Sequence, residues 1–193
     1  SSESDCHIIL RMYTKYGFKK TIESLDGVFA CVLIDLNIDT VYVARDPIGV
    51  RPLFFGTDGD GYGFSSDLKS LHNLFDNVTQ FKPGRVWDSK TKEYDCYYDA
   101  NVLYNEPNPI TPISDIRKTI RELFIQAVEK RLMSDREIGC LLSGGLDSSL
   151  VAALLSRCKK NGEAKLKTFS VGLEGSPDLK YARVVADHLG TDH

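Results

Sequence analysis

Hydrophobic positions change their spacing along the chain, and each change predicts a different element. From Cys6 to Tyr16 apolar side chains recur every three or four residues, which predicts a helix with Ser4 as its N-cap and Gly17 as its stop. After residue 25 the apolar residues fall in short runs separated by Gly, Pro, Asn and Asp, a pattern typical of antiparallel strands and tight turns. We expect strands at 28–35, 40–45, 51–55 and 62–66, a short helix at 67–75, and further short strands between 77 and 98.

A proline-rich stretch separates this first half from a second half with a different pattern. Residues 105–112 hold three of the seven prolines, so we assign 105–113 to an extended linker between domains 1–104 and 114–193. In the second domain helical and strand patterns alternate, which predicts an α/β fold with the beginning of a parallel sheet. The expected elements are helices at 114–133, 147–158 and 179–189 and strands at 138–142 and 166–171. The buried face of the first of these helices is expected to hold Ile116, Ile120, Leu123, Ala127 and Val128.

The turn between the strand at 138–142 and the next helix carries the clearest candidate chemistry. It reads Ser-Gly-Gly-Leu-Asp-Ser-Ser over residues 143–149. Glycines let a backbone approach a ligand closely, and the free amides of a first helical turn favour an anion by about 0.3–1 kcal/mol. An ordinary strand-to-helix turn of small residues is the simpler alternative. The full pattern after an apolar strand favours a phosphate-binding turn.

Composition narrows the class of protein. The 193 residues are 42% hydrophobic, which fits one large or two small globular domains. With 24 Lys and Arg against 27 Asp and Glu, the net charge of −3 gives no electrostatic case for nucleic acid or an acidic membrane. The longest apolar runs, such as 28–34, are too short to span a bilayer, and no secretory signal opens the chain. Neither the cysteines nor the histidines show metal-ligand spacing, and the five cysteines form no C-x-x-C pair, so we expect a disulfide-free protein of the cytoplasm.

The glycine-rich turn lacks the lysine of the G-x-x-x-x-G-K-[ST] phosphate loop. It resembles instead the PP-loop of ATP pyrophosphatases, which grip the β- and γ-phosphates of ATP. A second motif lies in the first half, where residues 25–31 and 44–55 resemble the class II, N-terminal-nucleophile glutamine amidotransferase domain. Together, and in this order, the two motifs resemble the glutamine-hydrolysing asparagine synthetases. The fold that this implies is part of an amidotransferase domain with antiparallel sheets, followed by the start of a PP-loop domain.

The resemblance implies an enzyme with two sites. One domain releases ammonia from glutamine, while the other uses ATP and Mg to adenylylate the side chain of aspartate, and ammonia then displaces AMP to give asparagine. Glutamine, aspartate and ATP are the implied small-molecule partners. Oligomers are common in the family, and a homodimer is the form that the resemblance suggests.

The family's site residues carry over only where the motifs match. Asp5 matches the aspartate that holds the amino group of glutamine, although a carboxylate near a helix start is also explained by the helix dipole. Asp147 matches a position near the magnesium, where a cation would separate it from the triphosphate. The positions that match ATP contacts are Leu142, Ser143, Gly144, Gly145, Asp147, Ser148 and Val171. Arg45, Asp46, Arg51 and Pro52 match signature positions that we interpret as scaffolding.

Departures from the family pattern limit these expectations. The family nucleophile is a cysteine at the mature N-terminus, and because this chain opens with Ser1 no catalytic residue is assigned. The chain is therefore expected to be an incomplete piece of the enzyme. Two alternatives stay open: a relative that closes an amide ring on another carboxylate, as β-lactam synthetases do, and a non-catalytic binding module. The acidic turn at 58–61 lacks the later ligands of a calcium loop and is expected to be a hairpin turn.

Overall fold

The structure of the protein, a computed structural model, describes residues 4, 6–59, 61–102, 111–158 and 164–193. The chain consists of two compact units, residues 1–107 and 108–193, each with its own hydrophobic core. Of the expected linker, residues 105–110 lie outside the described part of the chain. In the part that is described, no helix combines the length and the apolar character needed to cross a membrane.

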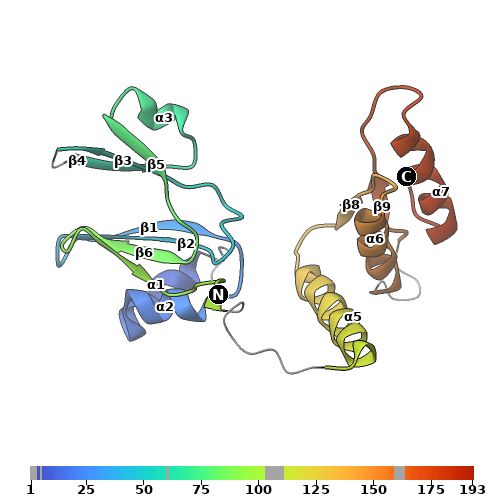
Figure 1. Cartoon of the computed structure of the whole chain (residues 1–193), viewed down its shortest axis with the longest axis horizontal. Helices are drawn as coiled ribbons and strands as arrows, with labels where there is room; N and C mark the ends of the chain where they lie inside the picture. Colours follow the sequence, from blue (N-terminus) through green and yellow to red (C-terminus); the bar gives the residue numbers. More distant parts are fainter. Residues whose placement is uncertain (1–3, 5, 60, 103–110, 159–163) are drawn as a thin grey trace. The chain divides into compact units, whose positions relative to one another are not determined.

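A four-stranded antiparallel sheet in the order β1-β2-β6-β7 forms the centre of the first unit (Figure 1). The predicted hairpin is confirmed, because β1 and β2 pair along their whole lengths across the turn at 36–39. The strands of this sheet are β1 (Ala30–Asp35), β2 (Thr40–Arg45), β6 (Arg85–Asp88) and β7 (Glu93–Cys96).

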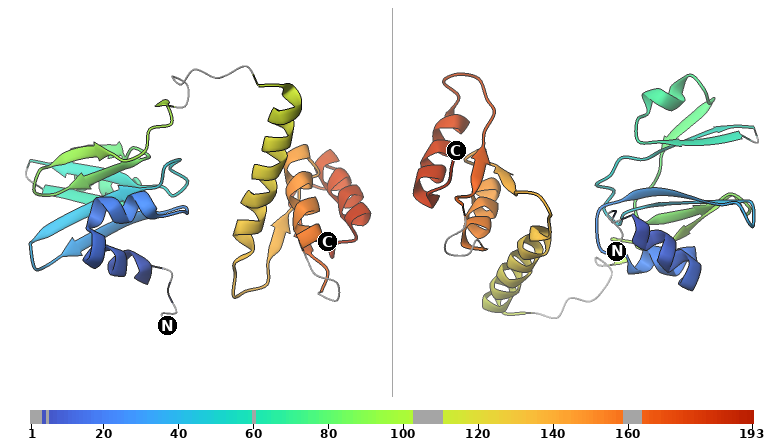
Figure 2. Two further views of the ribbon diagram at one scale, coloured as in Figure 1. Left: turned by 90° about the horizontal axis from the view of Figure 1, so that it is seen from below. Right: turned by 180° about the vertical axis from the view of Figure 1, so that it is seen from behind.

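Two helices, α1 (His7–Tyr16) and α2 (Phe18–Ser24), pack on one face of this sheet, as the right-hand view of Figure 2 shows. Alternation along β2 sends Tyr42 and Ala44 toward these helices, and the ring of Phe18 stacks on Tyr42 at 4.9 Å between centroids. Gly17 ends α1 at a φ of 78°, as expected. The helix begins later than expected, at His7, with the Ser4 hydroxyl accepting from the amide of Cys6. The sequence interpretation missed α2 altogether.

A second antiparallel sheet, in the order β4-β3-β5, packs through aromatic side chains against the face of the first sheet that carries Val43 and Trp87. Its strands are β3 (Phe54–Asp58), β4 (Gly61–Ser65) and β5 (Asn77–Gln80). Asp58 pairs with Gly61 across the acidic turn, so the hairpin expected there is confirmed. The ring of Trp87 lies 5.4 Å from those of Phe55 and Phe64.

Two predicted elements of the first unit have different bounds in the structure. β3 begins at Phe54 rather than at residue 51, because the backbone of Arg51 bonds to the side chains of Arg45 and Asp46 instead of joining the ladder. The helix expected at 67–75 shrinks to α3 (Lys69–His72). Beyond it the chain carries Phe75 against Gly56 and Gly63, where a Cβ atom would overlap the ring.

The second unit is built on a parallel pair, β8 (Gly139–Leu141) and β9 (Lys167–Phe169), which confirms the predicted parallel pairing. Asp192 continues the sheet on the other side of β9, since its carbonyl accepts from the amide of Thr168 at 2.7 Å. Helix α6 lies between α5 and α7 in the left-hand view of Figure 2. The helices are α5 (Ile113–Glu129), followed by the 3-10 turn η1 (Lys130–Leu132), α6 (Leu146–Cys158) and α7 (Pro177–Leu189).

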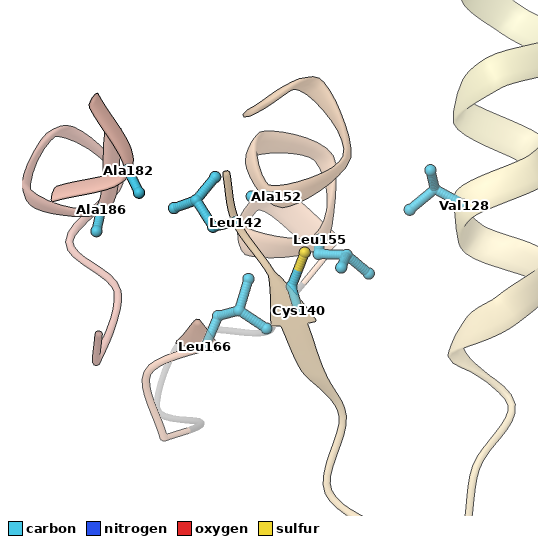
Figure 3. Close-up of a cluster of buried hydrophobic side chains, with 8 residues drawn as sticks. All are labelled: Val128, Cys140, Leu142, Ala152, Leu155, Leu166, Ala182 and Ala186. Atoms are coloured by element: carbon cyan, nitrogen blue, oxygen red, sulfur yellow. The ribbon is translucent and has the colours of Figure 1, made fainter. Parts of the chain in front are cut away.

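The core of this unit joins both strands to all three helices. In Figure 3 Leu142 points toward Ala182 and Ala186 of α7, while Val128 of α5 lies on the side of Leu155. The expected burial along α5 is wrong for most positions. Within the predicted apolar face only Val128 is buried, and Ile120 keeps 62% of its surface exposed. A helical period shows which face is apolar, but it does not show how much of that face the neighbouring helix covers.

Candidate functional site

The glycine-rich turn lies at the carboxyl end of β8, beside the loop that leaves the carboxyl end of β9. The Leu142 amide donates to the Phe169 carbonyl at 2.8 Å, so the sheet holds the two chain segments together just before they diverge. Residues 143–145 then lead directly into α6, whose first turn includes Asp147. Ligands of parallel α/β sheets bind at this edge, where backbone amides of a helix N-terminus are free.

Hydroxyl groups of the turn bond mainly to the turn itself. The Ser148 hydroxyl accepts from the Ser143 amide at 3.3 Å and lies 3.0 Å from the Ser143 hydroxyl. The Gly145 amide donates to the Ser143 hydroxyl over 3.4 Å, while the Ser149 hydroxyl donates to the Gly145 carbonyl at 2.7 Å. The two amide bonds are long for N–H donors, and a phosphate oxygen would accept from the same groups more strongly because it is charged.

The two adjacent glycines serve different purposes. Gly144 has a φ of 78°, and a Cβ there would lie 2.5 Å from the backbone nitrogen of Ala182, so this glycine is needed for packing against α7. At Gly145 a Cβ would meet only the Ser143 hydroxyl at 3.5 Å, an ordinary contact. The protein itself therefore does not require glycine at 145, and the empty space beside that backbone is what a bound anion would use.

Asp147 is exposed in the first turn of α6 and comes from the same short segment as the serines. It also lines a groove of about 620 Å³ between α5 and α6, together with the apolar side chains of Phe124, Leu150 and Leu154. Arg117, Arg121 and Arg157 line the same groove. Asp147 thus lies both at the N-terminus of α6 and at the edge of a groove that arginines also line.

Leu142 and Val171 differ in exposure. The Leu142 side chain is buried in the core, and its amide donates to the Phe169 carbonyl. Val171 follows β9 and keeps 93% of its surface exposed, beside Leu173 at 86%. The loop after β9 therefore presents apolar side chains at the sheet edge where the turn presents polar groups.

Asp5, the expected contact of glutamine, lies outside the described residues. The described groups nearest to it in the chain are Ser4 and Cys6, at the start of α1.

Two of the signature residues of the first unit, Arg45 and Asp46, form a buried scaffold, as expected, whereas Arg51 and Pro52 are exposed. Asp46 is 1% exposed, and its carboxylate accepts from a series of backbone amides at 2.6–3.3 Å. Burial alone would raise the pKa of this carboxyl, but the bonds from the amides outweigh it and lower the pKa. The donors are the amides of Phe29, Ile48, Gly49, Val50 and Arg51.

Arg45 stabilises the same loop through carbonyl groups. Its guanidinium donates to the carbonyls of Gly49, Arg51 and Phe81 at 2.6–2.7 Å. These hydrogen bonds of Arg45, like those of Asp46, are internal to the protein, so both side chains stabilise the loop rather than face a ligand.

One polar cluster at the sheet edge was missed by the sequence interpretation. The His193 ring bonds through Nδ1 to the Thr168 hydroxyl at 2.9 Å and through Nε2 to the Ser170 hydroxyl at 3.0 Å. The three residues come from β9, the loop after it and the segment after α7, so no local spacing in the sequence could have indicated the cluster. Among the described residues, no three or more His, Cys, Asp or Glu side chains are grouped so as to hold a metal ion.

Comparison with known proteins adds two family matches on one chain. Residues 1–85 match the model of the glutamine amidotransferase domain, and residues 119–193 match that of asparagine synthase. The chain is thus similar to the glutamine amidotransferase domain in its first half and to asparagine synthase in its second. The second match contains the whole turn at 143–149 together with both strands of the parallel pair.

Individual members of the asparagine synthetase family align with nearly all of the chain. It is 45% identical to an asparagine synthetase [glutamine-hydrolyzing] of Triphysaria versicolor, over 98% of this chain and 33% of the relative. The identity is 44% to one from Arabidopsis thaliana, with the same coverage, and 42% to the human protein, where the chain covers 38% of the relative. The chain thus spans about a third of the length of these curated relatives.

Proposed function

We propose that the full-length protein makes asparagine from aspartate, using ATP and ammonia released from glutamine. The observation that carries this proposal is the glycine- and serine-rich turn at 143–149, which leads into a helix N-terminus on a chain that also matches the amidotransferase domain. In this scheme an oxygen of the aspartate side-chain carboxylate attacks the α-phosphorus of ATP, and pyrophosphate leaves. Ammonia then attacks the activated carbonyl carbon, and AMP leaves with the bonding electron pair.

The residues of this chain would bind and orient ATP. The amides of Ser143 and Gly145, with the Ser148 hydroxyl, are the proposed donors to the pyrophosphate oxygens, and the space beside Gly145 admits the close approach. Gly144 supports the turn from behind through its contact with α7. The Leu142 carbonyl and the exposed Val171 are proposed to contact the adenosine. In the other site, Asp5 is proposed to hold the amino group of glutamine.

Magnesium is proposed to accompany the triphosphate. The exposed carboxylate of Asp147 lies in the first turn of α6, in the same segment as the donors of the turn, and one or two carboxylates with phosphate oxygens are the set that Mg²⁺ prefers. The residues present therefore fit the ion. When bound, Mg²⁺ would neutralise charge on the phosphates as pyrophosphate departs.

The test is glutamine-dependent AMP release by the full-length protein with aspartate and with other carboxylic acids. Asparagine and AMP formed in equal amounts with aspartate support the proposal. AMP formed only with another acid would identify a different ligase, and no AMP with any acid would favour a binding module. Sedimentation of the same preparation tests the proposed homodimer.

A series of variants then tests whether the activity depends on the turn. Ammonia is supplied directly, so that the measured rate does not depend on the amidotransferase site. Gly145→Ala should fold normally yet lower the rate of AMP formation at least tenfold, because the methyl group occupies the space proposed for phosphate. Gly27→Ala is the matched control, since a Cβ at Gly27 meets nothing within 4 Å and its φ lies outside the left-handed region. Full activity of Gly145→Ala would contradict the placement of the pyrophosphate.

A further inference from the structure

His193 lies where three segments of the second unit meet. Residues 191–193 follow α7 and return beside β9, and the ring bonds on one side to Thr168 and on the other to Ser170. Thr168 is buried within the sheet, whereas Ser170 is the first residue after β9. One imidazole therefore connects a fixed strand to the start of the exposed loop at 170–176.

Residues 191–193 are held in place by other hydrogen bonds than the one between His193 and Ser170. That segment is already attached through the Thr168 amide, which donates to the Asp192 carbonyl at 2.7 Å, and through the Asp192 amide, which donates to the Leu166 carbonyl at 2.9 Å. The hydroxyls of Thr168 and Thr191 lie a further 2.9 Å apart. The contact between His193 and Ser170 thus constrains the loop rather than the segment that carries the histidine.

The constrained loop leaves the parallel pair at the same end as the turn. Val171 and Leu173 expose their apolar side chains just beyond Ser170, and Gly172 packs on Leu179 of α7, with a Cβ there only 3.1 Å from Leu179 Cγ. The same helix supports Gly144 in the turn. Helix α7 therefore contacts both loops directly, and His193, carried by the segment after α7, fixes the first residue of the second loop.

We propose that His193 is a positioning residue of the nucleotide site, which orients Ser170 and so fixes the loop that carries Val171. This inference rests on the proposed function, because it assigns the loop to the nucleoside end of ATP. His193 touches no reacting atom. It holds the Ser170 hydroxyl in one orientation, and the exposed apolar surface of Val171 is thereby kept in place for the base and ribose. Removing the bond should loosen nucleotide binding and leave the chemistry at the phosphates intact.

The experiment compares His193→Gln, Ser170→Ala and the double variant in the full-length protein, with ammonia as nitrogen donor. His188→Gln is the matched control, a change of the same kind at an exposed histidine of α7. The loss of the hydrogen bond between His193 and Ser170 should raise the KM for ATP roughly two- to tenfold in either single variant. The KM for aspartate and kcat should stay within about twofold of the wild type. Since His193 acts through Ser170, the double variant should bind ATP no more weakly than the weaker single variant.

Hydrogen exchange provides a readout that does not depend on activity. In His193→Gln, amides of residues 170–176 should exchange faster while those of α6 keep their protection. An unchanged KM for ATP in both single variants would overturn the proposal, as would an equal loss of protection in α6 and the loop. A wild-type protein that forms no AMP from ATP and aspartate would remove the proposed function, and this inference with it. An active wild type with unaffected variants removes the inference alone.

Discussion

The loop that follows β2 and the turn that follows β8 are made of similar residues, with an aspartate and a glycine of positive φ in each. Asp46 lies buried under backbone amides, whereas Asp147 is exposed at a helix N-terminus. Gly49 and Gly144 have φ values of 74° and 78°, and a Cβ at either would overlap neighbouring atoms. Polar groups in the first loop satisfy one another, while in the second the amides of Ser143 and Gly145 make only long hydrogen bonds, of 3.3 and 3.4 Å. The difference shows that residue type alone does not separate a structural loop from a candidate binding turn; the two loops differ in whether the polar groups already have strong partners.

The largest expected effect on stability comes from removing Asp46, with the removal of Asp147 as the comparison. Asp46→Ala leaves several buried amide donors unpaired and should lower the free energy of unfolding of the first unit by about 3 kcal/mol. Asp147→Ala should change the stability of its own unit by less than about 0.5 kcal/mol. Trp87 is the only tryptophan of the chain and is buried in the first unit, so its fluorescence during denaturant unfolding follows that unit. Equal stability of the Asp46→Ala variant and the wild type would contradict the scaffold role.

Glycine substitutions should show an intermediate effect. Gly49→Ala forces a side chain into positive φ and against Pro83, where the Cβ would lie 2.6 Å from Cγ, and should cost about 2 kcal/mol by Trp87 fluorescence. Gly144→Ala should cost a similar amount, measured as lost amide protection in α6 and α7. Gly145→Ala should be close to neutral in the same exchange measurement. A large loss of protection in Gly145→Ala would mean that both glycines of the turn are structural.

The smallest effect expected is a dependence of stability on acid pH. The pKa of Asp46 is lower in the folded than in the unfolded protein, where an aspartate carboxyl has a pKa of about 3.9. The stabilisation that the ionised Asp46 gives the folded protein is therefore complete above the unfolded-state pKa, and it is lost as the pH falls through the folded-state pKa. Asp35 and Asp95 also have lowered pKa values, so the comparison has to isolate Asp46. Unfolding curves at pH 6, 4 and 3 should converge for wild type and Asp46→Asn as the pH falls; curves that remain parallel would exclude this linkage.

Much of the framework could be predicted from the sequence because local patterns determine it. The hairpin of β1 and β2 follows from two strand-like runs around a polar turn, and the parallel pair from two apolar runs that alternate with helices. The turn at 143–149 was found because its residues are contiguous. Where the structure differs, side-chain and packing contacts decide: Arg45 and Asp46 draw Arg51 out of β3, and the neighbouring helix covers only part of the apolar face of α5.

The candidate site shows the same division between local and distant information. Gly144 and Gly145 look equivalent in the sequence, and only the position of α7 distinguishes them. His193 is separated from Ser170 by a loop and a whole helix, so its role depends on how the chain returns to the sheet.

The contact of Gly144 with α7 also bears on the order in which the site is assembled. Because the backbone of α7 supports the turn from a distant part of the sequence, loop-closure entropy makes that contact slow to form compared with the pairing of neighbouring residues. During synthesis the turn leaves the ribosome well before its support does. The proposed anion site is thus completed only once α7 has been translated and docked, so a nascent chain that pauses before that point holds the motif without the support of that helix.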